Sequence, residues 1–191
     1  VPLTNIYRGV LLPDANFSIK LTGHTPCFRR EAGSYGKDVR GLNRLHQFEK
    51  VEIVRIETPE NAETALQEML SHVKHLLESL GLQYRVLRLC GGDTGFAAAI
   101  TYDFEVYSAA QEKWLEVSSV SRFDTFQSNR LKLRYKDENK KSRLCHTLNG
   151  SALALPRIMA ALLENNQGPN GISIPECLTR YTGFKTITNN T

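Results

Sequence analysis

Alternating apolar and polar positions predict a long hairpin in the first third of the chain. Residues 28–31 and 46–56 repeat with a period of two, which is typical of strands. The segment 32–44 between them is rich in Gly, Ser, Asp and Arg and is predicted to be a polar loop. Residues 3–7 also have a β-like pattern.

Apolar positions spaced three and four residues apart predict two helices. The first spans about residues 59–80, with Thr58 as its cap, Pro59 in its first turn and Gly81 after its end. The second spans about residues 152–165.

Further strands complete a sheet in which neighbouring strands run antiparallel. Residues 83–90 predict a buried strand, residues 91–95 a tight loop, and residues 101–107 with 113–121 a second hairpin. Hairpins with helices set apart, instead of alternating βαβ units, are typical of α+β proteins. The sequence therefore predicts an α+β fold, an antiparallel β-sheet flanked by helices, in one domain over residues 1–191.

The composition is that of a protein with one hydrophobic core. Of 191 residues, 41% are hydrophobic, and no apolar stretch approaches the roughly 20 residues of a membrane helix. The first residues lack the pattern of a signal peptide, so we expect a soluble, cytoplasmic protein without a membrane partner. The four cysteines form no C-x-x-C pair, which favours reduced thiols. A net charge of +4 is compatible with a polyanionic partner without demonstrating one.

The predicted hairpin carries side chains that suit a nucleotide. Its periodicity places Arg29 and Glu31 on one face of the first strand, and Phe48 and Glu52 on one face of the second. An arginine can hold phosphate through bidentate hydrogen bonds, and an aromatic ring can stack on a base. An ordinary cross-strand Arg–Glu pair beside a half-buried phenylalanine would have the same spacing, so the spacing leaves both interpretations open.

Three segments, in the same order, resemble motifs of seryl-tRNA synthetases. Motif 2, over about residues 25–54, is matched by TPCFRREAG at 25–33 and HQFEKVE at 46–52. The family's ATP and metal strand, about residues 114–121, is matched by EVSS. Motif 3, about residues 147–166, is matched by LNGSALA and the Pro-Arg that follows it.

This resemblance implies that residues 1–191 are the C-terminal part of a class II aminoacyl-tRNA synthetase catalytic domain. Such a serine–tRNA ligase uses ATP to convert L-serine into seryl-adenylate. It then transfers the seryl group to the 3′ end of tRNA(Ser), and also of tRNA(Sec). In the family, a helical tRNA-binding arm, motif 1 and a T-x-E loop precede this region. We therefore expect a fragment of a homodimeric enzyme, with little or no activity of its own.

In this family ATP is gripped at both ends, and the matching residues imply the same here. Arg29 would bind the α-phosphate, Glu31 would contact the adenine and Phe48 would stack on it. Arg157 would reach the far phosphate, which makes Arg29 and Arg157 the catalytic residues. The ATP-binding set implied by the resemblance is Arg29, Arg30, Glu31, Phe48, Glu116, Val117, Ser118, Ser119 and Arg157.

The resemblance also implies a metal site and a serine site. Glu116 and Ser119 match the positions that hold Mg²⁺, an ion that prefers hard oxygen ligands. A regular strand would point them to opposite faces, so we expect either a local irregularity or a ligand acting through water. Glu52 matches the residue that binds the amino group of serine, with Asn149 and Ser151 near the amino acid.

Two other functions compete with this interpretation. One is a related ligase that delivers an activated amino acid to a carrier protein, and the other is a non-catalytic binding module with the same fold. Arg122 departs from the family pattern, which has a neutral amide there. A basic run is compatible either with contact to the tRNA acceptor end or with an exposed surface. Its residues are Arg130, Lys132, Arg134, Lys136, Lys140, Lys141 and Arg143.

Overall fold

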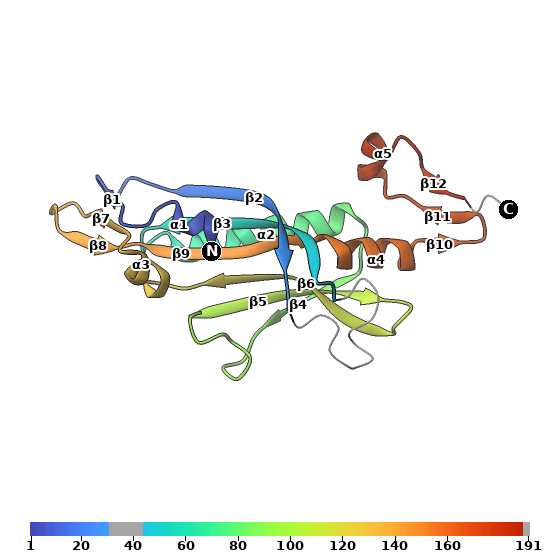
Figure 1. Cartoon of the computed structure of the whole chain (residues 1–191), viewed down its shortest axis with the longest axis horizontal. Coiled ribbons are helices and arrows are strands. Elements are labelled where there is room, and N and C mark those ends of the chain that lie inside the picture. The colour runs from blue at the N-terminus through green and yellow to red at the C-terminus, as the bar shows by residue number, and fades with distance from the viewer. Residues whose placement is uncertain (31–43, 189–191) are drawn as a thin grey trace.

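The computed structural model describes residues 1–30 and 44–188, and its centre is a six-stranded antiparallel sheet (Figure 1). The strand order is β2-β3-β9-β6-β5-β4, and every neighbouring pair is antiparallel. The six strands are β2 (Ile19–Phe28), β3 (Gln47–Glu57), β4 (Tyr84–Arg88), β5 (Ile100–Ser108), β6 (Lys113–Arg122) and β9 (His146–Ala154). The predicted α+β fold with an antiparallel sheet is confirmed.

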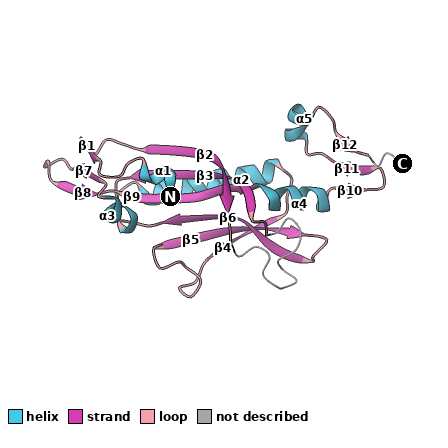
Figure 2. Ribbon diagram, viewed as in Figure 1, coloured by secondary structure: helices cyan, strands magenta, loops and turns pink. Residues whose placement is uncertain are grey.

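Helices α2 (Ala62–Ser79) and α4 (Leu155–Asn165) pack on one face of this sheet (Figure 2). Their apolar residues and those of the central strands form one core, in which each fully buried large side chain contributes roughly 1.5–3 kcal/mol. Fully buried members of this core include Leu66, Met69, Val73, Leu77, Phe104, Val120 and Leu148. The strand residues between these core positions therefore face the other side of the sheet.

Shorter elements surround the sheet. A second small core of Ile56, Leu133, Tyr135 and Cys145 lies under a three-stranded sheet of order β1-β7-β8. No helix in the described part of the chain is long and apolar enough to cross a membrane. The shorter elements are α1 (Pro2–Asn5), β1 (Leu11–Leu12), α3 (Phe126–Leu131), β7 (Arg134–Lys136), β8 (Ser142–Leu144), β10 (Gln167–Gly168), β11 (Gly171–Ser173), α5 (Glu176–Thr182) and β12 (Thr186–Ile187).

Two ladders of the main sheet contain register shifts. In the first, Phe104 pairs with Ser118 whereas Glu105 pairs with Glu116, so β6 has one extra residue at Val117. The second shift lies between β3 and β9. A bulge of this kind redirects the side chains that follow it, and such irregularities are common beside functional sites.

The prediction of a first strand at residues 28–31 is wrong. The strand β2 starts at Ile19 and ends at Phe28, so Arg29 follows the strand. In the first half of β2, partly buried Ile19 and Leu21 alternate with exposed Lys20 and Thr22. In the second half this pattern ends, since residues 24–26 are all exposed. The predicted loop at 32–44 lies, except for its last residue, outside the described residues.

Other boundaries differ from the prediction for local reasons. Both main helices begin three residues later than predicted: Asn61 caps α2, and residues 152–154 belong to β9. The start of the chain is helical instead of β-like, which suits Pro2 in a first turn. The strand β4 is a mostly exposed edge strand and not the buried one predicted. The second hairpin is confirmed as β5 and β6.

Candidate functional site

A pocket formed by β3, β6, β9 and the start of α4 brings together most of the predicted ATP-binding residues. Cross-strand register puts Phe48, Ser151 and Glu116 on the face of the sheet opposite α2 and α4. Seven of the predicted site residues line this pocket: Arg29, Phe48, Glu116, Val117, Ser118, Ser151 and Arg157. The other lining residues, which are not among the predicted site residues, are Arg44, Leu45, Lys50, Ala154 and Pro156.

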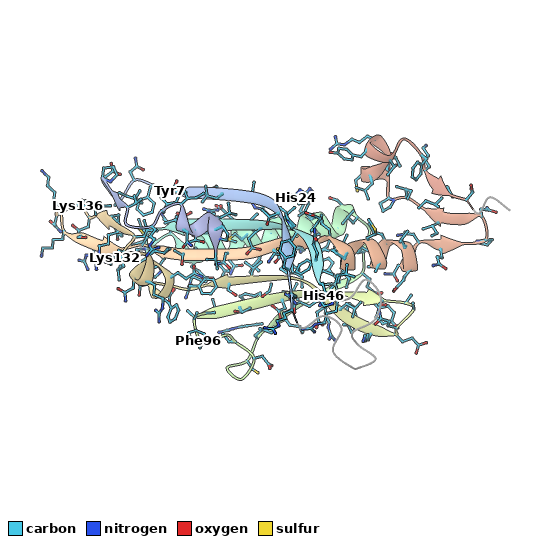
Figure 3. The ribbon with its side chains drawn as sticks, viewed as in Figure 1. Tyr7, His24, His46, Phe96, Lys132 and Lys136 are labelled. Atoms are coloured by element: carbon cyan, nitrogen blue, oxygen red, sulfur yellow. The ribbon has the colours of Figure 1, made fainter. Side chains whose placement is uncertain are left out.

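Arg29 and Phe48 lie together on one side of the pocket. The backbone N–H of Arg29 donates to the carbonyl oxygen of His46 at 2.9 Å, which closes the hairpin just beyond β2 (His46 is labelled in Figure 3). The guanidinium carbon of Arg29 lies 5.3 Å from the centroid of the Phe48 ring, within the range of a cation–π contact. A cationic fork beside an aromatic face can hold a phosphate and a base of one ligand.

Arg157 and Glu116 form the other side of the pocket. Arg157 is the third residue of α4, and its Nη1 donates to the backbone carbonyl of Glu116. Burial lowers the pKa of the Arg157 guanidinium, while the Glu116 carboxylate opposes that shift. Burial also raises the pKa of Glu116, as does repulsion from Asp103, and Arg157 and Arg29 act in the opposite sense. Two arginines converging near a helix N-terminus favour an anionic ligand.

The bulge in β6 turns Glu116 and Ser119 to the same face of the sheet. Ser119 pairs with Asp103 and Glu116 pairs with Glu105, two residues that lie on one face of β5. Of the two routes considered from sequence, the local irregularity is therefore present. Their oxygens fit Mg²⁺ in type. Within the described ranges no three His, Cys, Asp or Glu side chains converge as a metal site, so an ion here needs further oxygens, such as those of phosphate or water.

The residues predicted to bind the substrate serine are neighbours across β3 and β9. Glu52 pairs directly with Ser151, whose Oγ lies 3.4 Å from Glu52 Oε2. Lys50 Nζ is 2.9 Å from the same carboxylate oxygen, and both side chains are about one quarter exposed. Asn149 lies on the same face, and its Nδ2 is 3.4 Å from Gln127 Oε1 on α3. Lys50 was detectable from its spacing of two from Glu52, whereas Gln127 carried no sequence signal.

Five predicted ATP-binding residues differ in placement from the rest. Ser119 does not line the pocket, although it shares a face of the sheet with Glu116. Val117 is 1% exposed and its side chain belongs to the core, so any contact with a pocket ligand must use its main chain. The buried Ser118 hydroxyl donates to the carbonyl oxygen of Ser151 at 2.6 Å. Arg30 follows Arg29 and does not line the pocket. Glu31 lies outside the described residues.

The basic run lies away from this pocket along the molecule. Figure 3 shows Lys132 and Lys136 toward the end opposite β10–β12, with His46 nearer the middle. In the run, Arg143 Nε pairs with Asp137 Oδ2 at 3.0 Å.

A family model for the tRNA synthetase class II core domain (G, H, P, S and T) matches residues 1–166. The chain is 56% identical over 182 residues to a serine–tRNA ligase of Methylacidiphilum infernorum, and the match covers 95% of this chain and 43% of that protein. It is also 56% identical over 189 residues to a serine–tRNA ligase of Salinibacter ruber.

Solved structures are similar over nearly the whole chain. Seryl-tRNA synthetase of Pyrococcus horikoshii, complexed with ATP, has a TM-score of 0.92 and 39% identity over 98% of this chain and 42% of its own. Cytoplasmic serine–tRNA ligase of Naegleria fowleri, in complex with AMP, has a TM-score of 0.90 and 31% identity over 100% of this chain and 45% of its own. This chain spans less than half the length of these relatives.

Proposed function

The chain belongs to the tRNA synthetase class II core domain family, and from this premise we propose that it is the ATP-binding and serine-binding part of a seryl-tRNA synthetase. In this proposal residues 1–191 are the C-terminal part of the catalytic domain. The observation that carries the proposal is the convergence of Arg29, Phe48, Glu116 and Arg157 on one pocket. The likeness to a synthetase complexed with ATP supports the choice of nucleotide.

The two arginines hold the phosphates of ATP in this scheme. Arg29 lies beside Phe48, so a base stacked on the ring leaves the α-phosphate within reach of the guanidinium. Arg157 enters from the start of α4 and meets the far phosphate, with the helix N-terminus adding to its attraction for anions. A cation at both ends of the triphosphate neutralises charge as pyrophosphate leaves.

Mg²⁺ fits the proposal because Glu116 and Ser119 share one face and offer hard oxygens. When bound, the ion would supply charge neutralisation between the phosphates. Glu52 would bind the ammonium group of serine, since a carboxylate one quarter exposed in the sheet is a natural partner for a cation. Lys50 already pairs with Glu52, so serine must share that carboxylate with it or displace it. Asn149 and Ser151 complete the polar surroundings.

The reaction then needs no nucleophile from the protein. The carboxylate of L-serine attacks the α-phosphorus in line and pyrophosphate leaves. A ribose hydroxyl at the 3′ end of tRNA(Ser), or tRNA(Sec), then loses its proton and attacks the carbonyl carbon of the seryl-adenylate, and AMP leaves as the acyl–phosphate bond breaks. Positioning and charge neutralisation provide the catalysis. The whole enzyme is proposed to be a homodimer. A cytoplasmic location is supported by the Naegleria fowleri relative, which is described as cytoplasmic.

Binding of a non-reactive seryl-adenylate analogue, a seryl-sulfamoyl adenosine, tests this function by calorimetry. We expect binding that Arg29→Ala weakens at least tenfold, and that Arg88→Ala, an arginine of β4 outside the pocket, leaves unchanged. Tighter binding of the glycyl or alanyl analogue would favour the carrier-protein ligase. Binding of ATP without any preference among aminoacyl analogues would favour the non-catalytic module. Absence of all binding would contradict the proposal.

A further inference from the structure

A carboxylate in the middle of β5 faces the proposed metal site without being part of it. Asp103 pairs directly with Ser119 across β5 and β6, and the bulge brings Glu116 to the same face. Directly paired residues of an antiparallel ladder project to the same side, with their side chains in contact distance. The metal site implied by the family resemblance, Glu116 and Ser119, therefore has a second carboxylate, that of Asp103, directly opposite Ser119.

The contacts of Asp103 distinguish it from an ordinary surface carboxylate. It lies directly opposite Ser119 in the ladder, and burial raises the pKa of Asp103 against the smaller, lowering effect of hydrogen bonding with the Ser119 side chain. Its Oδ1 is buried, and no hydrogen-bond partner for that atom exists among the described residues. The next carboxylate on the same face, Glu105, is instead paired with a cation, Arg85, whose Nε lies 2.5 Å from Glu105 Oε2. In the described part of the chain, Asp103 has Ser119 and no cationic partner.

Because Ser119 and Asp103 are directly paired, a hydrogen bond between their side chains would decide what the Ser119 oxygen can do. A serine hydroxyl has one proton to donate and two lone pairs to offer. A carboxylate without a proton only accepts, so the proton of this bond comes from Ser119. With the proton committed to Asp103, the lone pairs of Ser119 remain available to a cation.

We propose that Asp103 is a positioning residue for Mg²⁺: it holds the Ser119 hydroxyl by its proton, so that the oxygen lone pairs point toward the ion shared with Glu116. The inference rests on the proposed function, because it takes the ATP and metal site as given. Carboxylates behind a metal ligand orient that ligand and strengthen it as a donor, and their loss typically weakens metal binding 10–100-fold.

The test compares the affinity of a non-hydrolysable ATP analogue with and without Mn²⁺, measured by calorimetry on the whole chain. The readout is the factor by which Mn²⁺ tightens analogue binding. We expect Asp103→Asn, which has nearly the same shape, to reduce this factor about tenfold while metal-free binding stays within about twofold. A merely structural role would weaken both. Glu105→Gln is the matched control, because it removes a neighbouring carboxylate that Arg85 already neutralises.

A double-mutant cycle identifies the route through Ser119. If Asp103 acts through Ser119, then adding Asp103→Asn to Ser119→Ala produces no further loss. Two results would overturn the inference but not the proposed metal site. The losses of the two variants could be additive, or Ser119→Ala could lower the effect of Mn²⁺ on analogue binding while Asp103→Asn leaves it unchanged. If neither Ser119→Ala nor Glu116→Gln changed the effect of Mn²⁺ on analogue binding, both the proposed metal site and the inference would be overturned. If Asp103→Asn does not fold by circular dichroism, Asp103→Glu replaces it, and the displaced carboxylate is expected to give the same loss.

Discussion

Replacing Gly150 by alanine places a methyl group where the sheet has no room for it. Gly150 lies in β9 opposite Val120 of β6. Its neighbours in the chain, Asn149 and Ser151, are proposed to contact the substrate serine. A Cβ built there lies 2.8 Å from Val120 Cγ2 and 3.0 Å from both the Val120 Cα and the Ser119 carbonyl oxygen. Two of these three atoms are backbone atoms that no rotamer change can move. The strands themselves must therefore separate.

Opposing effects set the size of the change in stability. Replacing glycine by alanine restricts the unfolded chain, which alone would stabilise the protein by about 0.4–1 kcal/mol. Overpacking of a well-packed site costs about 1–3 kcal/mol. We therefore expect Gly150→Ala to lower the free energy of unfolding by about 1–2 kcal/mol. The shift of the Ser119 backbone should also reduce the effect of Mn²⁺ on binding of the ATP analogue.

Urea unfolding followed by circular dichroism measures this loss of stability. Gly91→Ala is the matched control, because a Cβ there meets no atom within 4 Å and the glycine has no positive φ. The control should be neutral or slightly stabilising. If Gly150→Ala proved as stable as Gly91→Ala, the reasoning from close strand contact at this position would be refuted.

Phe48→Ala should weaken ATP binding by about 1–3 kcal/mol, the usual contribution of an aromatic ring stacked on a base, and equal affinities in equilibrium dialysis would contradict the stacking role. Arg55→Met should lower the free energy of unfolding by about 3–5 kcal/mol, because Arg55 Nε bonds Glu57 Oε1 at 2.7 Å and Glu57 is only 1% exposed. A loss below about 1 kcal/mol in urea unfolding would show that the buried carboxylate does not need this partner. Burial raises the pKa of Cys145 to about 12, so a thiol reagent at pH 8 should label exposed Cys90 at once and Cys145 only in denaturant. Immediate labelling of Cys145 in the folded chain would contradict its burial.

The parts of the fold that sequence predicts well are those with one buried face. Residues 101–107 and 113–121 alternate because Phe104 and Val120 face the core, and they form β5 and β6. The strand β2 lies at the sheet edge, and only its first half alternates, so the pattern is too short to predict the whole strand. The start of α4 was misplaced because residues 152–154 are apolar and continue from strand into helix without a loop.

Only some residues of the candidate site could be predicted from the sequence. Arg29, Phe48 and Arg157 could be named because the order of motifs along the chain resembles a known family, and the three residues share a pocket. Asp103 and Gln127 could not, because their relevance follows from which residues they face across strands and helices. A single extra residue in β6 decides which side chains share a face of the sheet. The alternation of apolar and polar residues does not reveal the position of this bulge.

Amino-acid-dependent ATP–pyrophosphate exchange tests the central claim most directly. The chain is assayed alone and joined to the N-terminal portion of the Methylacidiphilum infernorum relative, with serine, alanine, threonine and glycine in turn. We expect exchange with serine only, in the joined protein, and its loss in Arg29→Ala. Exchange that depends on alanine or glycine, or no exchange with serine in a folded joined protein that binds ATP, would contradict a seryl-tRNA synthetase.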